Sequence, residues 1–124
     1  AKANADNLAA LVLAIQADPF DLANEFTPFP GYSGFAASLG QTFLPLARDF
    51  AKPVLFIHGD SHIFRLDQPF KDAKGKVIEN ITRLEVFGAE HMHAVRVSVD
   101  PAKGPDMWAF QPIFNPADRP RAPK

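Results

Sequence analysis

Histidine, aspartate and serine gather in one short stretch of this 124-residue chain, His58-Gly59-Asp60-Ser61-His62. The stretch follows an apolar run, 54–57, that is typical of a buried strand, and Gly59 favours a sharp turn where the strand ends. Around such a turn, Asp60 and His62 can aim a carboxylate and an imidazole into one cavity, as a divalent metal ion requires. Taken singly, each residue is equally typical of an ordinary turn. Their convergence predicts a metal site, to which other parts of the fold must add ligands.

Composition narrows the classes of function. The formal net charge is -1 and no run of lysine or arginine occurs, so nothing favours a nucleic acid or an acidic membrane surface as partner. The absence of cysteine removes disulfides, thiolate ligands and a cysteine nucleophile, and leaves the compartment open. No apolar run approaches the roughly 18 residues of a membrane span. Because the first residue is Ala1, we expect the natural beginning of the protein to lie upstream.

The residues before the turn predict two parallel strands joined by a helix. The apolar run 8–15 is expected to be a strand that is buried on both faces. A helix is expected from 33 onward, with Ser33 as its cap. Its apolar face is formed by residues at spacings of four and three, namely Phe35, Leu39, Phe43, Leu46 and Phe50. The order strand, helix, strand favours a parallel pair.

The residues after the turn indicate antiparallel strands. Segments 80–87 and 93–99 alternate apolar and polar residues and are expected to pair with each other, with Arg83 and Glu85 on the polar face of the first. Asp100 to Gly104 is turn chemistry that forms a hairpin with a last strand, 107–114. We therefore predict a mixed α/β (α+β) domain over residues 1–114, with a parallel strand-helix-strand unit before an antiparallel three-stranded segment. A proline-rich, poorly ordered tail, 115–124, follows it.

Gly59-Asp60-Ser61-His62, after a buried strand and before antiparallel strands, resembles the last metal-binding motif of the calcineurin-like metallophosphoesterases, Gly-His-x-His. By position, His62 corresponds to the second histidine of that motif, and Asp60 replaces the first. Gln16, at the end of the preceding strand and shortly before Pro19, takes the place of the family's lone histidine. The resemblance extends over residues 11–114 and corresponds to the C-terminal half of such a domain. It implies that Asp60, His62 and Gln16 are metal ligands.

The resemblance also implies an activity. The parent protein would hydrolyse a small phosphate ester with water activated by divalent metal ions (Mn, Mg or Fe/Zn), two of them in the complete domain. The family's Asp-x-His, Gly-Asp-x-x-Asp/Asn and Gly-Asn-His-Asp/Glu motifs are absent from these 124 residues. The fragment would therefore be inactive without its missing N-terminal half or another chain. Oxygen ligands from Gln16 and Asp60 suit manganese, magnesium or calcium better than zinc, unless one metal site has been lost and Gln16 only ends a strand.

Three other interpretations remain open. The chain is a catalytically lapsed relative that acts as a binding module, or an interaction domain whose strand edge and apolar loop (Phe26, Phe29, Phe35) pair with another chain. A strand followed by Gly-Asp-Ser also resembles the opening of the GDSL serine esterases, with Ser61 as nucleophile, although no Asp-x-x-His follows.

Other polar residues are weaker candidates for a site. His91 and His93 are two residues apart and could bind a metal from a strand, but His93 continues an apolar stripe and is better explained as a packed core residue. Arg65 and Arg83 could meet a phosphate, yet arginines on half-exposed strands are usually solvated.

Overall fold

The computed structural model describes residues 2–21, 24–29, 34–89 and 91–118. Its elements in chain order are α1 (Lys2–Ala5), β1 (Leu11–Ala14), β2 (Phe20–Asp21), β3 (Asn24–Pro28), the π-helix η1 (Ala36–Phe43), α2 (Leu44–Phe50), β4 (Val54–His58), β5 (Arg65–Asp67), β6 (Ile81–Glu85), β7 (Ala94–Val99), the 3-10 helix η2 (Pro101–Asp106) and β8 (Trp108–Ile113). Within these residues, no helix is both long and apolar enough to cross a membrane.

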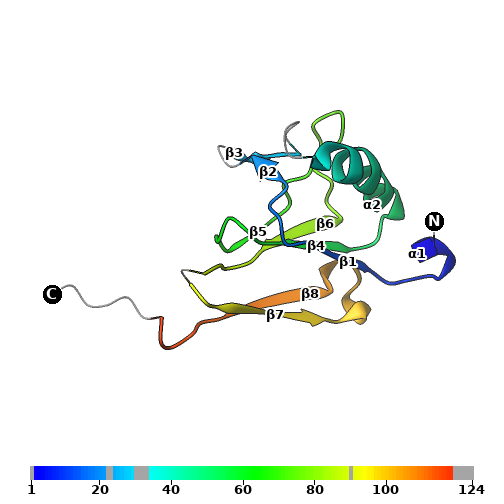
Figure 1. Cartoon of the computed structure of the whole chain (residues 1–124). Helices are drawn as coiled ribbons and strands as arrows, with labels where there is room; N and C mark the ends of the chain where they lie inside the picture. The colour runs from blue at the N-terminus through cyan, green and yellow to red at the C-terminus, as the bar shows by residue number, and fades with distance from the viewer. Residues whose placement is uncertain (1, 22–23, 30–33, 90, 119–124) are drawn as a thin grey trace.

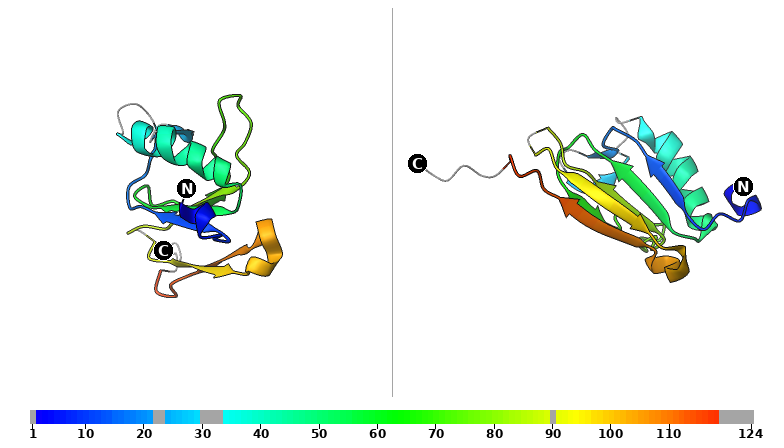
Figure 2. Two further views of the ribbon diagram at one scale, coloured as in Figure 1. Left: turned by 90° about the vertical axis from the view of Figure 1, so that its right-hand side faces the viewer. Right: turned by 90° about the horizontal axis from the view of Figure 1, so that it is seen from below.

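A four-stranded sheet in the order β1-β4-β6-β5 is the centre of the fold. Strands β1, β4 and β6 run parallel, and β5 joins the edge antiparallel to β6. The helical segment η1–α2 covers one face of this sheet, and the β7–β8 hairpin lies on the other (Figures 1 and 2). The mixed α/β class is confirmed, and so are the parallel pair β1–β4 and the final hairpin.

The predicted antiparallel three-stranded segment is wrong. Segment 80–87 does not pair with 93–99, because β6 lies between β4 and β5 while β7 pairs with β8. The alternation of Arg83 and Glu85 suggested a solvated face, but both side chains are fully buried. Buried ion pairs make this inward placement possible, so a strand with a polar face occupies the interior of the sheet.

Strand β1 is more exposed than predicted, which leaves it accessible to a partner chain. The apolar run was expected to be buried on both faces, but β1 is the edge strand and its burial alternates. Leu11 and Leu13 pack against the core, whereas Val12 is 57% exposed. The side chain of Val12 is therefore exposed on one face of the sheet, and the backbone edge of β1 that points away from β4 has no partner strand among the described residues.

The helix is present, and its predicted apolar face is largely confirmed, because Leu39 and Phe50 are buried, Phe35 and Phe43 pack against the core, and only Leu46 differs. The amide of Leu44 donates to the carbonyl of Leu39, five residues back, so η1 has π-helical turns. After these wider turns, Ala47 points inward (2% exposed) and Leu46 points outward (59% exposed), contrary to the predicted spacing. The predicted cap, Ser33, lies outside the described residues.

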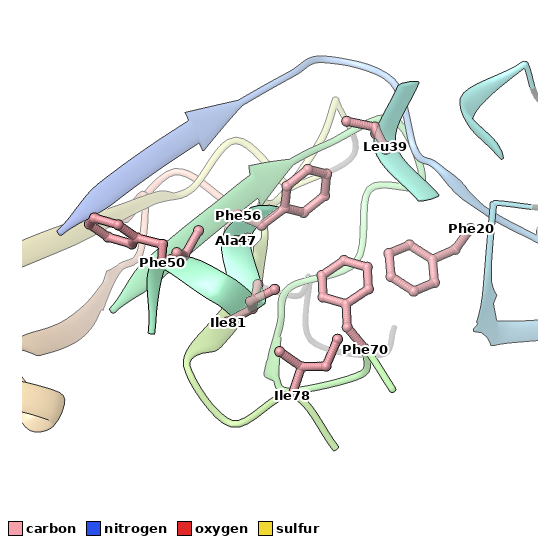
Figure 3. Packing of buried hydrophobic residues seen from close by; sticks show 9 residues of the cluster. Phe20, Leu39, Ala47, Phe50, Phe56, Phe70, Ile78 and Ile81 are labelled. Atoms are coloured by element: carbon pink, nitrogen blue, oxygen red, sulfur yellow. The ribbon is translucent and has the colours of Figure 1, made fainter. Parts of the chain in front are cut away.

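Aromatic side chains fill the core between the helix and the sheet (Figure 3). The ring of Phe70 contacts those of Phe20 and Phe56, with centroids 5.7 and 5.6 Å apart. Phe29 and Phe35 also pack against this cluster, so the expectation that they form an exposed docking loop is wrong. The side chain of Phe26 lies outside the described residues.

Candidate functional site

Three parallel strands end at the same edge of the sheet, where the chemistry-bearing residues gather. His58 is the last residue of β4 and lies opposite Glu85, the last residue of β6. Gln16 and Asp18 follow the end of β1. The carboxyl ends of parallel strands are the usual place for a site in open α/β sheets, because the strands diverge there and the loops leave room.

Backbone hydrogen bonds fix the turn that follows β4. The amide of Gly59 donates to the carbonyl of Gln16 at 3.1 Å, extending the pairing of β1 and β4. Beyond it, Asp60 and His62 have positive φ angles of 78° and 64°. Such angles are unfavourable for residues other than glycine, and strain of this kind concentrates at functional sites.

Gln16 and Asp60, both predicted ligands, are in contact. The amide Nε2 of Gln16 donates to Oδ1 of Asp60 at 3.2 Å. His62 packs on the backbone of Gly88, since a Cβ at position 88 would overlap the His62 ring. The structure thus brings two of the three predicted ligands together, and the convergence of Asp60 and His62 on one ion stays a prediction.

A buried network of ion pairs and hydrogen bonds holds the turn at the end of β6. The hydroxyl of Ser61 donates to Oε1 of Glu85, and Arg65 donates to Oε2 of Glu85 at 2.8 Å. Arg83 donates through Nε to Asp67 at 2.7 Å, and its guanidinium carbon lies 4.1 Å from the ring centroid of Phe20.

This network argues against Ser61 as a nucleophile and against Arg83 as a phosphate-binding residue. Ser61 donates to a carboxylate rather than to an imidazole, so it lacks the activated arrangement of a serine nucleophile. Arg83 is fully buried and ion-paired, which leaves its guanidinium no face for a phosphate.

Among the polar residues at these strand ends, His58 has the most unusual environment. Only 1% of it is exposed, and its ring stacks on that of Phe20 with centroids 5.5 Å apart. Its Nδ1 lies 3.2 Å from the carbonyl oxygen of Gly59 and 3.6 Å from Oδ1 of Asp18. Its Nε2 is buried without a hydrogen-bond partner among the described residues. Burial lowers the pKa of His58, so the ring is neutral near pH 7.

Glu85 is perturbed in the opposite direction. Burial raises the pKa of its carboxyl group to about 7, and the positive charge of Arg65 only partly opposes this effect. Strong perturbation of neighbouring groups is typical of functional sites, although structural ion-pair networks also produce it.

A second group of potential ligands, His91, His93 and Asp118, lies at the far end of the β7–β8 hairpin. The amide of Asn115 donates to Nδ1 of His93 at 3.1 Å, so the neutral ring carries its proton on Nε2, which faces Asp118 at 3.5 Å. A protonated nitrogen cannot ligate a metal. His93 also packs edge-on against Phe87 and Phe114, which favours its interpretation as a packed residue.

Sequence reasoning missed Asp18 and Glu85. Asp18 was assigned only to a turn before Pro19, and Glu85 was assigned to a solvated face. The sequence did contain one signal for them. Side chains alternate between the two faces of a strand, so His58 lies on the same buried face of β4 as Val54 and Phe56. A histidine buried there needs polar partners nearby.

A cavity of about 300 Å³ lies at the other end of the strands, next to Ala51 and Asn80. These residues precede β4 and β6, so the cavity does not coincide with the group of polar residues at the carboxyl ends.

Comparison with known proteins adds no identification. No family model, no curated protein and no solved structure matches this chain. The resemblance to metallophosphoesterases therefore depends on the sequence motif alone.

Proposed function

We propose that this chain contributes a metal-binding turn to a metal-dependent phosphoesterase that hydrolyses a small phosphate ester. The observation that carries the proposal is the contact of Gln16 with Asp60 across the ends of two adjacent parallel strands. Asp60 and His62 are held there in strained backbone conformations. Strain of this kind is retained where function requires a particular side-chain direction.

The residues present fit a hard or borderline divalent ion. The Asp60 carboxylate, the His62 imidazole and, after rotation of its amide, the Gln16 oxygen would hold the ion, and these donors suit Mn²⁺ or Mg²⁺. When bound, such an ion supplies a Lewis acid that lowers the pKa of water and binds phosphoryl oxygens. Ser61, anchored to Glu85, keeps the turn in place.

Three ligands do not complete a two-metal centre, so the proposal includes a partner: the missing N-terminal half or another chain. Strand β1 supports this part of the proposal, because it is an edge strand of the sheet, its Val12 is 57% exposed, and Leu8, just before the strand, is 41% exposed. An apolar, unpaired strand edge is a template for pairing with a further strand. A strand added there would also approach Gln16 and Asp60.

A second candidate is a binding module that has lost catalysis. It is favoured by the same contact, since an amide that donates to a carboxylate satisfies both groups without an ion. This alternative predicts that divalent ions leave the turn unchanged.

The test is hydrolysis of a generic aryl phosphate by the protein made from its whole gene, with added Mn²⁺ or with chelator. We expect turnover that requires metal and that falls at least about 100-fold in Asp60→Ala and in His62→Ala, because ligands matter at least as much as their outer partners. Asp49→Ala, which removes an exposed carboxylate on α2, should change turnover little. The 124 residues alone should be inactive. Absence of metal-dependent turnover in the whole protein would remove the phosphoesterase proposal.

A further inference from the structure

A second set of potential ligands lies at the same strand ends, and one of its members, Glu85, also anchors the proposed catalytic turn through Ser61. Asp18, His58 and Glu85 each offer one ligand atom, and these atoms lie within 4.8 Å of one another. His58 and Glu85 are 1% and 0% exposed, and the side chain of Asp18 is 8% exposed. The group is therefore closed to bulk water.

The hydrogen bonds of His58 are those of a metal ligand. The carbonyl oxygen of Gly59, 3.2 Å from Nδ1, can only accept a hydrogen bond, so the proton of the neutral ring belongs on Nδ1. Nε2 then presents a lone pair that is buried and has no partner among the described residues. Metal-ligating histidines characteristically donate their other ring N–H to a carboxylate or a backbone carbonyl.

Among the described residues, the surrounding network is balanced in charge when Glu85 is protonated and has one negative charge in excess when Glu85 is ionised. Among the described residues it contains three carboxylates (Asp18, Asp67 and Glu85) and two guanidinium groups (Arg65 and Arg83). Arg83 is paired with Asp67 and Arg65 with Glu85. Oδ1 of Asp18 accepts from the amide of Phe20 and lies 3.6 Å from Nδ1 of the neutral His58. A buried excess of negative charge is costly unless a proton or a cation compensates for it.

We propose that Asp18, His58 and Glu85 bind one divalent transition-metal ion, separate from any ion at Asp60 and His62. One imidazole and two carboxylates suit Mn²⁺, Fe²⁺ or Zn²⁺. Because the site is closed, the ion ties the segment after β1 to the ends of β4 and β6 and stabilises the fold. The inference does not depend on the phosphoesterase proposal.

The test uses Mn²⁺ as probe and the full 124-residue chain after treatment with chelator. In the double variant Asp60→Ala/His62→Ala, calorimetric titration should still show one bound equivalent. Electron spin echo spectra of that ion should show coupling to a directly bound imidazole nitrogen. Absence of binding by this variant would overturn the proposal, whereas loss of hydrolysis in the whole protein would not affect it.

Two matched variants then test whether Asp18 is a ligand of the ion. Asp18→Asn removes a charge but keeps an acceptor for the amide of Phe20, which donates to Oδ1 of Asp18 at 2.9 Å. It should weaken Mn²⁺ binding at least about tenfold. Asp67→Asn removes a carboxylate from the same network, but this group is 28% exposed, and it should weaken binding less than about threefold. Equal weakening by the two variants would reduce the effect to general electrostatics and overturn the assignment of Asp18 as ligand.

Discussion

At the scale of single residues, the turn after β4 is built against backbone preference. Asp60 has a φ of 78°, where a side chain costs energy and glycine does not. A side chain that lowers the stability of the fold at this position is explained if that side chain is needed to bind an ion.

Asp60→Gly tests whether function and stability conflict at the turn. Glycine avoids the cost of about 1–2 kcal/mol that a side chain has in the left-handed region but loses about 0.5–1 kcal/mol more backbone entropy. We therefore expect the free energy of unfolding to rise by about 0.5–1 kcal/mol, despite the loss of the exposed hydrogen bond to Gln16. Urea unfolding measures this change, and Mn²⁺ titration should show a loss of binding at the turn. A clear fall in stability would instead mean that Asp60 has a structural role.

Glu85 makes stability depend on pH. Its pKa is about 7 in the folded protein, against an ordinary value of 4.5, so between these values the native state binds the proton that the unfolded chain has released. The stabilisation is complete below pH 4.5 and is lost as pH rises through 7, to the extent of roughly 3 kcal/mol.

The contribution of Glu85 is measured by urea unfolding of the wild type and Glu85→Gln at pH 5 and pH 8 in the presence of chelator. The wild type should lose stability toward pH 8 relative to the variant. The lowered pKa of His58 acts in both proteins and opposes this trend, since it costs stability as pH falls below the unfolded value. Equal pH slopes in the two proteins would show that Glu85 is ionised throughout.

At the scale of elements, the register of η1–α2 decides which side chains reach the core. After the π-helical turns, Ala47 lies inward and Leu46 outward, while Leu39 keeps its predicted inward position. Leu39→Ala should cost about 2–5 kcal/mol of unfolding free energy, because it leaves a cavity. Leu46→Ala should stay within about 0.5 kcal/mol of the wild type. Comparable losses in chemical denaturation would mean that the helix is α-helical throughout and that Leu46 is buried.

Much of the arrangement of elements was predictable from local patterns. The apolar run before Gly59, the helical spacing and the turn at Asp100–Gly104 predicted β4, the helix and the β7–β8 hairpin. The position of β6 was not predictable, because its pattern resembles that of a half-solvated strand. Only the partners of Arg83 and Glu85, distant in sequence, show that its polar face is buried. The π-helical register is equally hidden, since local spacing assumes 3.6 residues per turn.

At the scale of the whole molecule, the proposed partner adds its strand to the open backbone edge of β1, whose Val12 lies on an exposed face of the sheet. Val12→Lys places a charge on that open face and should leave the stability of the 124 residues within about 0.5 kcal/mol of the wild type. It should sharply reduce metal-dependent hydrolysis by the whole protein, because charges on edge strands oppose pairing. Leu46→Lys, at an equally exposed apolar position on α2, is the control and should have no effect. Similar behaviour of the two variants would argue against a docking role for β1.

The candidate site was predictable only in part, because some of its residues come from segments far apart in the chain. Gln16 and Asp60 follow strands that the sequence places side by side, so their contact could be predicted. Asp18 and Glu85 join His58 through folding of segments far apart in the chain, and no local pattern indicates this. The direction of His62, against Gly88, depends on a loop 26 residues further along.

The most direct test of the account is to locate the ion itself. Crystals of the whole protein grown with Mn²⁺ should give an anomalous scattering peak within about 2.0–2.4 Å of an Asp60 oxygen and a His62 nitrogen, with the Gln16 amide no longer donating to Asp60. Full occupancy of Mn²⁺ elsewhere, with the hydrogen bond from Gln16 to Asp60 intact and no peak at the turn, would contradict it.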